Sequence, residues 1–230
     1  MSDCFPSAVG EIIAEEVETM ISHTDARSDG DPSEVGQQFF YGVGRKKNYK
    51  KAFPYLLEAA KAGDAHCQNL VGYAYQFGLG VEQDMKKARS WYTRASHNGD
   101  KEAIGNLALM HERGEGGGAN IRKAFSLYQK GAKLGDAWAQ CNLAVAYLEG
   151  LGTTQNLSEG VKWLRRAARK GDSKAQYNLG MAYLTGEGVH ENYNAARTWL
   201  SKAANQGHKK ASTKLKALKQ YSLKYTTSVR

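Results

Sequence analysis

Glycine pairs and histidines are residue types in this chain that could support chemistry. Gly-x-Gly occurs in phosphate-binding loops, but a dinucleotide site needs a preceding strand and the longer G-x-G-x-x-G pattern. Here the glycine pairs recur as turns after predicted helices, which argues against that class. The six histidines form no H-E-x-x-H motif, and the sequence contains no G-x-S-x-G nucleophile motif. The sequence therefore predicts no catalytic residue, no metal ligand and no cofactor, and it indicates a protein that is not an enzyme.

The three cysteines, Cys4, Cys67 and Cys141, indicate a reducing compartment. An odd number without C-x-x-C spacing suits neither a disulfide framework nor a zinc site. The acidic N-terminus is unlike a signal peptide, and no apolar run reaches the roughly 18 residues that a membrane span needs. We therefore expect a cytoplasmic protein. For Cys67, a packed thiol is favoured over a nucleophile, because no base is placed beside it.

An internal repeat of 36 residues organises the sequence. Repeats of this length are typical of helical solenoids, in which each unit buries its apolar faces against its neighbours. The glycine pairs that mark the repeat are Gly42/Gly44, Gly78/Gly80, Gly114/Gly116, Gly150/Gly152 and Gly186/Gly188. We predict an N-terminal segment (1–28), five repeats (29–64, 65–100, 101–136, 137–172 and 173–208) and a C-terminal segment (209–230).

Each repeat is predicted to hold two helices, and the fifth shows the pattern most clearly. Ala175, Leu179 and Ala182 fall on one helical face, Asp172 is a suitable N-cap, and Gly186 suits the helix end. The second helices follow capping residues at one phase: Asn48, Asp84, Asn120, Asn156 and Asn192. The predicted fold is all-α, a right-handed α–α superhelix with terminal helices.

The repeating residues resemble the Sel1-like repeat family, which is related to tetratricopeptide repeats. The pattern A-x-x-x-L-G/A-x-A-Y, then G-x-G, then A-x-x-W-x-x-K/R-A-A-x-x-G-D covers residues 65–208 well and 29–64 more loosely. The resemblance implies a scaffold or adaptor that binds a peptide or helix of another protein in its concave groove. One branch of the family has been linked to enzyme-like activity, so a hydrolase remains a third hypothesis, although no activated nucleophile is found.

The candidate groove residues lie on the first helix of each repeat. Asn106, Asn142 and Asn178 share one phase, where related solenoids carry asparagine, and amides can both donate to and accept from a peptide backbone. The flanking candidates are Tyr73, Leu109, Val145, Met181, Leu148, Leu184 and Tyr177. Two alternatives remain open: the asparagines bond only to neighbouring helices, and some of the apolar residues are simply buried between helices.

Charge is distributed unevenly along the chain. Residues 1–34 hold nine acids and one base, residues 35–208 hold 24 bases and 14 acids, and residues 209–230 hold seven bases and no acid. The second function hypothesis is therefore an electrostatic binder of RNA or an acidic membrane surface, acting through the basic convex face and the C-terminal tail. Nucleic acid is the less favoured partner, because no RNA-binding module is present and the aromatic residues fall in core phases.

Both termini contain predicted helices. Residues 7–23 place apolar residues on one helical face and glutamates largely on the other. This helix either caps the first repeat or covers the groove until a partner displaces it. Residues 209–221 are predicted to form a basic capping helix after the last repeat.

Overall fold

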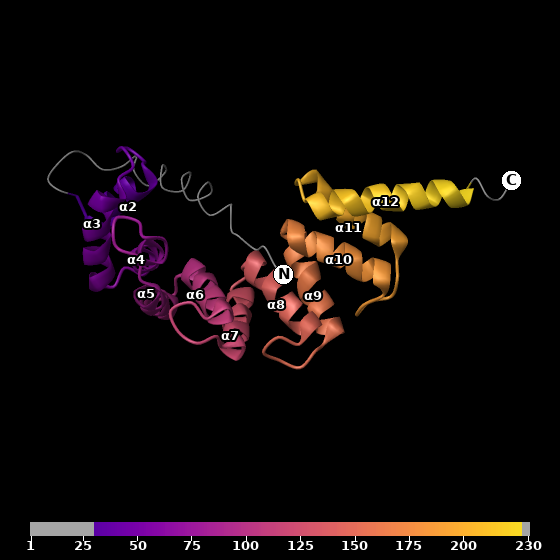
Figure 1. Cartoon of the computed structure of the whole chain (residues 1–230), viewed down its shortest axis with the longest axis horizontal. Helices are drawn as coiled ribbons and strands as arrows, with labels where there is room; N and C mark the ends of the chain where they lie inside the picture. Colours follow the sequence, from indigo (N-terminus) through magenta and orange to yellow (C-terminus); the bar gives the residue numbers. More distant parts are fainter. Residues whose placement is uncertain (1–29, 227–230) are drawn as a thin grey trace. The chain divides into compact units, whose positions relative to one another are not determined.

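The structure, a computed structural model, describes residues 30–226, with side chains through residue 219. Within this range the chain has eleven helices and no strand (Figure 1). The first helices of the five pairs are α2 (Pro32–Tyr41), α4 (Ala65–Phe77), α6 (Lys101–Arg113), α8 (Ala137–Glu149) and α10 (Ser173–Thr185). The second helices are α3 (Tyr49–Ala62), α5 (Met85–His97), α7 (Ile121–Lys133), α9 (Leu157–Arg169) and α11 (Tyr193–Asn205), and α12 (Lys209–Thr226) follows them. The predicted all-α fold of repeated helix pairs is confirmed.

The described chain divides into two compact units. Unit 1 holds residues 30–107 and 114–118, and unit 2 holds residues 108–113 and 119–226. The division therefore runs through α6 and the glycine-rich loop that follows it.

Side-chain caps fix where the helices begin. Asp172 Oδ1 accepts a hydrogen bond from the Ala175 amide at 2.6 Å at the start of α10. Asn192 Oδ1 accepts from the Ala195 amide at 2.9 Å at the start of α11. The same bond forms at the other predicted caps of the second helices, Asn48, Asp84, Asn120 and Asn156. Each cap satisfies an amide that has no partner within its helix, so the predicted starts are confirmed.

The second glycine of each pair fits against the preceding repeat. Gly80 has a φ of 74° and lies against the backbone carbonyl of Tyr49, in the first turn of α3. Gly152 has a φ of 72°, and a Cβ there would lie 2.5 Å from the carbonyl oxygen of Ile121, in the first turn of α7. Glycine is required at these positions for two reasons. The backbone is left-handed there, and successive repeats approach too closely to leave room for a Cβ.

Within a repeat, a small residue of the first helix faces a large residue of the second. A Cβ on Gly72 of α4 would lie 2.8 Å from the Tyr92 ring of α5. A Cβ on Gly180 of α10 would lie 2.7 Å from the Leu200 side chain of α11. These contacts bring the paired helices of a repeat close together.

The helix α12 begins at Lys209 and packs on the fifth repeat. Ala211 is fully buried in a cluster with Leu200 and Ala203, and Leu215 and Leu218 pack against it. This helix continues to Thr226, beyond the expected end at residue 221. The N-terminal helix expected at residues 7–23 lies outside the described residues.

Candidate functional site on the first helices of unit 1

One side of α4 carries a row of aromatic and polar side chains, of which Tyr73 and Phe77 are exposed, His66 is half-buried and Asn69 is buried. His66, Asn69, Tyr73 and Phe77 follow one another at steps of three or four residues, which places them along one side of the helix. We call these four residues the α4 stripe. Tyr73 is 39% exposed and Phe77 is 49% exposed, and their ring centroids lie 4.5 Å apart. Adjacent exposed rings of this kind commonly mark a contact surface for a partner.

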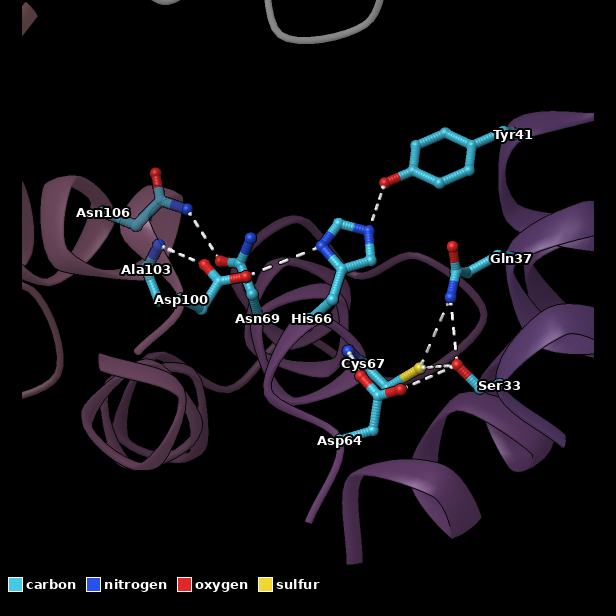
Figure 2. Close-up of polar contacts among 10 residues, drawn as sticks. All are labelled: Ser33, Gln37, Tyr41, Asp64, His66, Cys67, Asn69, Asp100, Ala103 and Asn106. Carbon is cyan, nitrogen blue, oxygen red and sulfur yellow. Dashed lines mark hydrogen bonds and ion pairs between the residues drawn. The ribbon is translucent and has the colours of Figure 1, made fainter. Parts of the chain in front are cut away.

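An amide pair joins the stripe to the next repeat. Nδ2 of Asn106 in α6 donates to Oδ1 of Asn69 at 3.1 Å (Figure 2). Within residues 30–226, the amino group of Asn69 and the carbonyl oxygen of Asn106 have no protein partner, and neither is a buried unsatisfied atom. The pair therefore retains an acceptor on the half-buried Asn106 and a donor on Asn69, which is 6% exposed, and together these are the complement of a peptide group.

His66 connects the first helices of three repeats. Its Nε2 lies 3.1 Å from the Tyr41 hydroxyl of α2, and its Nδ1 lies 3.6 Å from Oδ2 of Asp100 (Figure 2). Asp100 is itself the cap of α6, because its Oδ1 accepts from the Ala103 amide at 2.7 Å. The imidazole thus holds α4 between α2 and the start of α6.

The surroundings of His66 favour its charged form. Burial alone would lower the pKa of His66, but the hydrogen bond to Asp100 and the negative charges of Asp100, Asp64 and Glu102 raise this pKa above its ordinary value of 6.5. Burial and the charge of Asp100 raise the pKa of Tyr41, so its hydroxyl remains protonated. Carboxylates therefore give this end of the stripe a negative character.

A second polar cluster anchors α2 to α4 below the stripe. The Ser33 hydroxyl donates to Oδ2 of Asp64 at 2.8 Å and lies 3.3 Å from the Cys67 sulfur (Figure 2). Gln37 donates to the Ser33 hydroxyl at 3.0 Å. Cys67 is fully buried, and burial raises the pKa of its thiol to about 12. The expectation of a packed thiol is confirmed, and the thiolate needed for nucleophilic chemistry is disfavoured.

The three asparagines predicted for the groove differ in their bonding. Asn106 is paired with Asn69, whereas Nδ2 of Asn142 donates to the backbone carbonyl of Trp138 in its own helix at 3.1 Å. Asn178 has no hydrogen-bonding partner in the described part of the chain and is half-buried. The shared phase therefore does not produce one uniform ladder of amides, because the residue beside each asparagine differs between repeats.

The apolar candidates also differ in what they face. Leu109, Val145 and Met181 are half-buried on their first helices. Leu148 lies against Gly160 of α9, Leu184 packs in the cluster with Leu200 and Ala211, and the Tyr177 ring stacks on His208 with centroids 4.7 Å apart. These last three are directed partly toward neighbouring helices. In unit 1 the phase of Leu148 is occupied by Gln76, whose Oε1 accepts from the Tyr92 hydroxyl of α5 at 2.8 Å.

Sequence reasoning found Tyr73 and Asn106 but missed Asn69, His66 and Phe77. In the second repeat, the position equivalent to Asn106, Asn142 and Asn178 is Leu70, and Asn69 lies one residue before it. Comparing equivalent positions of the repeats therefore does not identify Asn69. His66 was considered only as a catalytic or metal-binding residue. The spacing of residues within α4 could have identified this row, because His66, Asn69, Tyr73 and Phe77 lie three or four residues apart and therefore on one side of a helix.

Within the part of the chain that the structure describes, neither a cluster of metal ligands nor a membrane-spanning helix is present. No group of three or more His, Cys, Asp or Glu side chains there is arranged to hold a metal ion. No helix between residues 30 and 226 combines the length and the hydropathy needed to cross a bilayer.

Comparison with known proteins places the repeat in a family. The family model for the Sel1 repeat matches residues 34–64, 65–100, 101–136, 139–172 and 173–208, which is well over half of the chain. No curated protein matches the chain. Sel1 repeat proteins are generally protein–protein interaction scaffolds.

Solved structures of bacterial proteins share the fold. A protective antigen from uropathogenic Escherichia coli with an SLR fold is 27% identical, with a TM-score of 0.79 over 84% of this chain and 41% of the antigen. This chain therefore spans less than half of the antigen's length. A Sel1 repeat protein from Oxalobacter formigenes is 25% identical, with a TM-score of 0.76 over 90% of this chain and 86% of that one. On the five matched repeats and these structures, the chain belongs to the Sel1 repeat family.

Proposed function

We propose that this protein is an adaptor that binds an extended peptide or a helix of a partner protein on the face formed by its first helices. Three features of unit 1 support the proposal. The rings of Tyr73 and Phe77 are exposed, the Asn69–Asn106 pair retains a donor and an acceptor, and the contact with α5 is made at Gly72, outside the stripe. Apolar contact and backbone hydrogen bonding are thus available on one surface.

The observation that carries the proposal is the unused donor and acceptor of the Asn69–Asn106 pair. One donor and one acceptor can bind the C=O and N–H groups of a peptide without reading its sequence. Specificity would then come from Tyr73 and Phe77, because aromatic anchors dominate the energetics of many interfaces. Asp100, Asp64 and Glu102 near His66 favour a partner segment that carries a basic residue beside its apolar one.

In unit 2 we propose a separate binding patch on the first helices α8 and α10. Asn178 is half-buried and has no hydrogen-bonding partner within the described residues, and Val145 and Met181 are partly exposed. Asn142, Leu148, Leu184 and Tyr177 complete the predicted set, with the orientations given above. Unit 2 would add a second patch, more apolar than that of unit 1.

Residues 7–23 remain a proposed intramolecular regulator or cap, although they lie outside the described residues. Of the two expected roles we propose the cap, because the apolar face of this segment suits the start of the first repeat, which has no preceding repeat within the described residues. A cap there leaves the first-helix face accessible to a partner.

Site-directed photo-crosslinking tests the proposed surface. A photoreactive phenylalanine analogue at position 73 is expected to crosslink one defined partner protein in its native cells. The matched control places the same analogue at Tyr193 of α11, a second-helix tyrosine that is 45% exposed. Equal crosslinking of the same protein from both positions, or no discrete product from position 73, would refute binding at the α4 stripe.

A further inference from the structure

Basic residues are segregated onto the second helices. The second helices α3, α5, α7, α9 and α11 hold 17 Lys and Arg residues against two Glu, whereas the first helices hold three against four Asp and Glu. Fifteen of the 17 basic residues are exposed, the exceptions being the half-buried Arg89 and Arg165. Solvent exposure alone does not explain why the basic residues lie on the second helices, since both the first and the second helices have one solvent-facing side.

In unit 1 the basic residues form two rows at equivalent positions of successive repeats. Lys50 and Lys86 share one phase, and Lys51 and Lys87 share the next. The Lys51 ammonium lies 5.8 Å from the Phe39 ring centroid, and the Lys87 ammonium lies 5.3 Å from that of Tyr75. Cation–π contacts of this kind restrict the side chains and keep their charges at the surface. We call these four lysines the lysine rows.

Few carboxylates in unit 1 neutralise this surface. Asp84 lies 3.4 Å from Lys87, an exposed pair of the kind that contributes little. Glu58 is the only acid on α3, and α5 has none. The lysine rows therefore present a positive potential that an acidic segment would complement.

The chain carries such a segment, directly connected to unit 1. Residues 1–29 contain seven Asp and Glu residues and a single Arg, and they lead into α2. A 29-residue segment can extend about 90 Å, far enough to reach the second helices of the unit to which it is tethered. Tethering raises the effective concentration to the millimolar range, so even weak electrostatic contacts become populated.

We infer that the acidic segment 1–29 binds in cis to the lysine rows of α3 and α5, on the face opposite to the proposed partner site. This occupant fits the surface better than single-stranded RNA does. RNA-binding surfaces of basic character usually add exposed aromatic rings for base stacking. Here Trp91 of α5 is only 9% exposed, and the Arg94 guanidinium covers its ring at 4.6 Å. The contact is electrostatic and leaves the α4 stripe accessible.

Paramagnetic relaxation enhancement on the full chain tests this contact. Cys67 and Cys141 are buried, so a nitroxide can be attached to Cys4 without substitution. We expect broadening of amide signals in α3 and α5, and its loss when NaCl rises from 0.1 M to 1 M, which shortens the Debye length from about 10 Å to about 3 Å. The variant K50E/K51E/K86E/K87E should abolish the broadening.

A matched variant and three outcomes make the test decisive. The variant K209E/K210E/K214E/K216E makes the same change of charge on α12, and it should leave the broadening of α3 and α5 intact. Broadening centred on the α4 stripe or on unit 2 would overturn the proposal. Broadening that disappears when the nitroxide-labelled, isotope-enriched chains are diluted with chains that carry neither label would also overturn it, since the contact would then be between copies. Absence of any localised broadening at low salt would do the same.

Discussion

Two glycines with nearly the same backbone conformation have different surroundings. Gly44 has a φ of 68° with no atom near its missing Cβ, whereas Gly80 has a φ of 74° and lies against the carbonyl of Tyr49. The difference has a simple origin: the described residues contain no repeat before the first for Gly44 to contact. Gly44 therefore needs glycine only for its backbone conformation, whereas Gly80 needs it also because another backbone lies close to it.

The substitutions Gly44→Ala and Gly80→Ala should therefore differ in cost. The left-handed conformation alone should make Gly44→Ala unfavourable by about 1–2 kcal/mol. Gly80→Ala adds a clash with backbone, and overpacking of this kind costs a further ~1–3 kcal/mol. Chemical denaturation followed by circular dichroism measures both. Equal destabilisation would show that Gly80 is required only for its backbone angles.

His66 should make the stability of unit 1 depend on pH. Because the folded-state pKa is raised above 6.5, the stabilisation is fully present below pH 6.5 and is lost as the pH rises through the folded-state pKa. The groups facing His66 are Asp100, Asp64, Glu102 and Tyr41. The loss is therefore expected as the pH rises above 6.5.

The comparison that isolates this effect is between wild type and His66→Gln. Burial lowers the pKa of His208, which gives the opposite slope and is common to both proteins. Urea midpoints measured from about pH 5.5 to about pH 8.5 should converge at the alkaline end and separate at the acid end, with wild type the more stable. A constant difference across this range would contradict the raised pKa of His66.

At the scale of elements, buried glutamines connect three second helices to the next first helix, at α3–α4, α7–α8 and α9–α10. Nε2 of Gln140 donates to the Ala132 carbonyl at 3.2 Å, and Nε2 of Gln176 donates to the Ala168 carbonyl at 3.1 Å. Oε1 of Gln176 accepts from Gln206 at 2.9 Å, but Oε1 of Gln140 is buried without a partner. The difference is local. Nε2 of Gln206 donates both to the Gly171 carbonyl and to Gln176, whereas Lys170, at the same phase, donates to the Gly135 carbonyl at 2.7 Å and not to Gln140.

Gln140→Leu and Gln176→Leu should consequently have unequal effects. Gln176→Leu loses two hydrogen bonds, each worth about 0.5–1.5 kcal/mol net. Gln140→Leu loses one hydrogen bond but removes a buried unsatisfied acceptor, whose burial costs about 1–3 kcal/mol. We expect Gln176→Leu to lower the thermal midpoint clearly and Gln140→Leu to leave it nearly unchanged. The reverse order would mean that Gln140 has a partner such as an ordered water.

The elements were largely predictable from sequence, and the site only in part. Caps such as Asp172 and Asn192 depend on a single local hydrogen bond, which the repeat phase displays directly. The bonding of Asn106 and Asn142 depends on which side chain a neighbouring turn supplies, and that differs between repeats. The unpartnered Oε1 of Gln140 likewise depends on the direction of Lys170. The repeat pattern shows which residues share one side of a helix, but it does not show which hydrogen bonds their side chains form.

At the scale of the whole molecule, charge and aromatic exposure distinguish two surfaces. The second helices carry most of the basic residues, while the first helices of unit 1 carry the amide pair and the exposed rings. In the two proposals, the first-helix surface binds the partner and the basic second-helix surface binds the acidic N-terminal segment. The affinity for the partner and the neutralisation of the basic surface then depend on different residues. Loss of the segment should then change salt sensitivity more than partner specificity.

The central claim is that the α4 stripe binds the partner, and the affinity of stripe variants for the crosslinked partner segment tests it most directly. Isothermal titration calorimetry should compare wild type, Tyr73→Ser with Phe77→Ser, and the control Tyr193→Ser. Removing two aromatic anchors should weaken binding by at least about tenfold, while the control should bind like wild type, because hot-spot energy is concentrated in such anchors. Equal affinity in all three proteins, with unchanged helicity, would contradict the account.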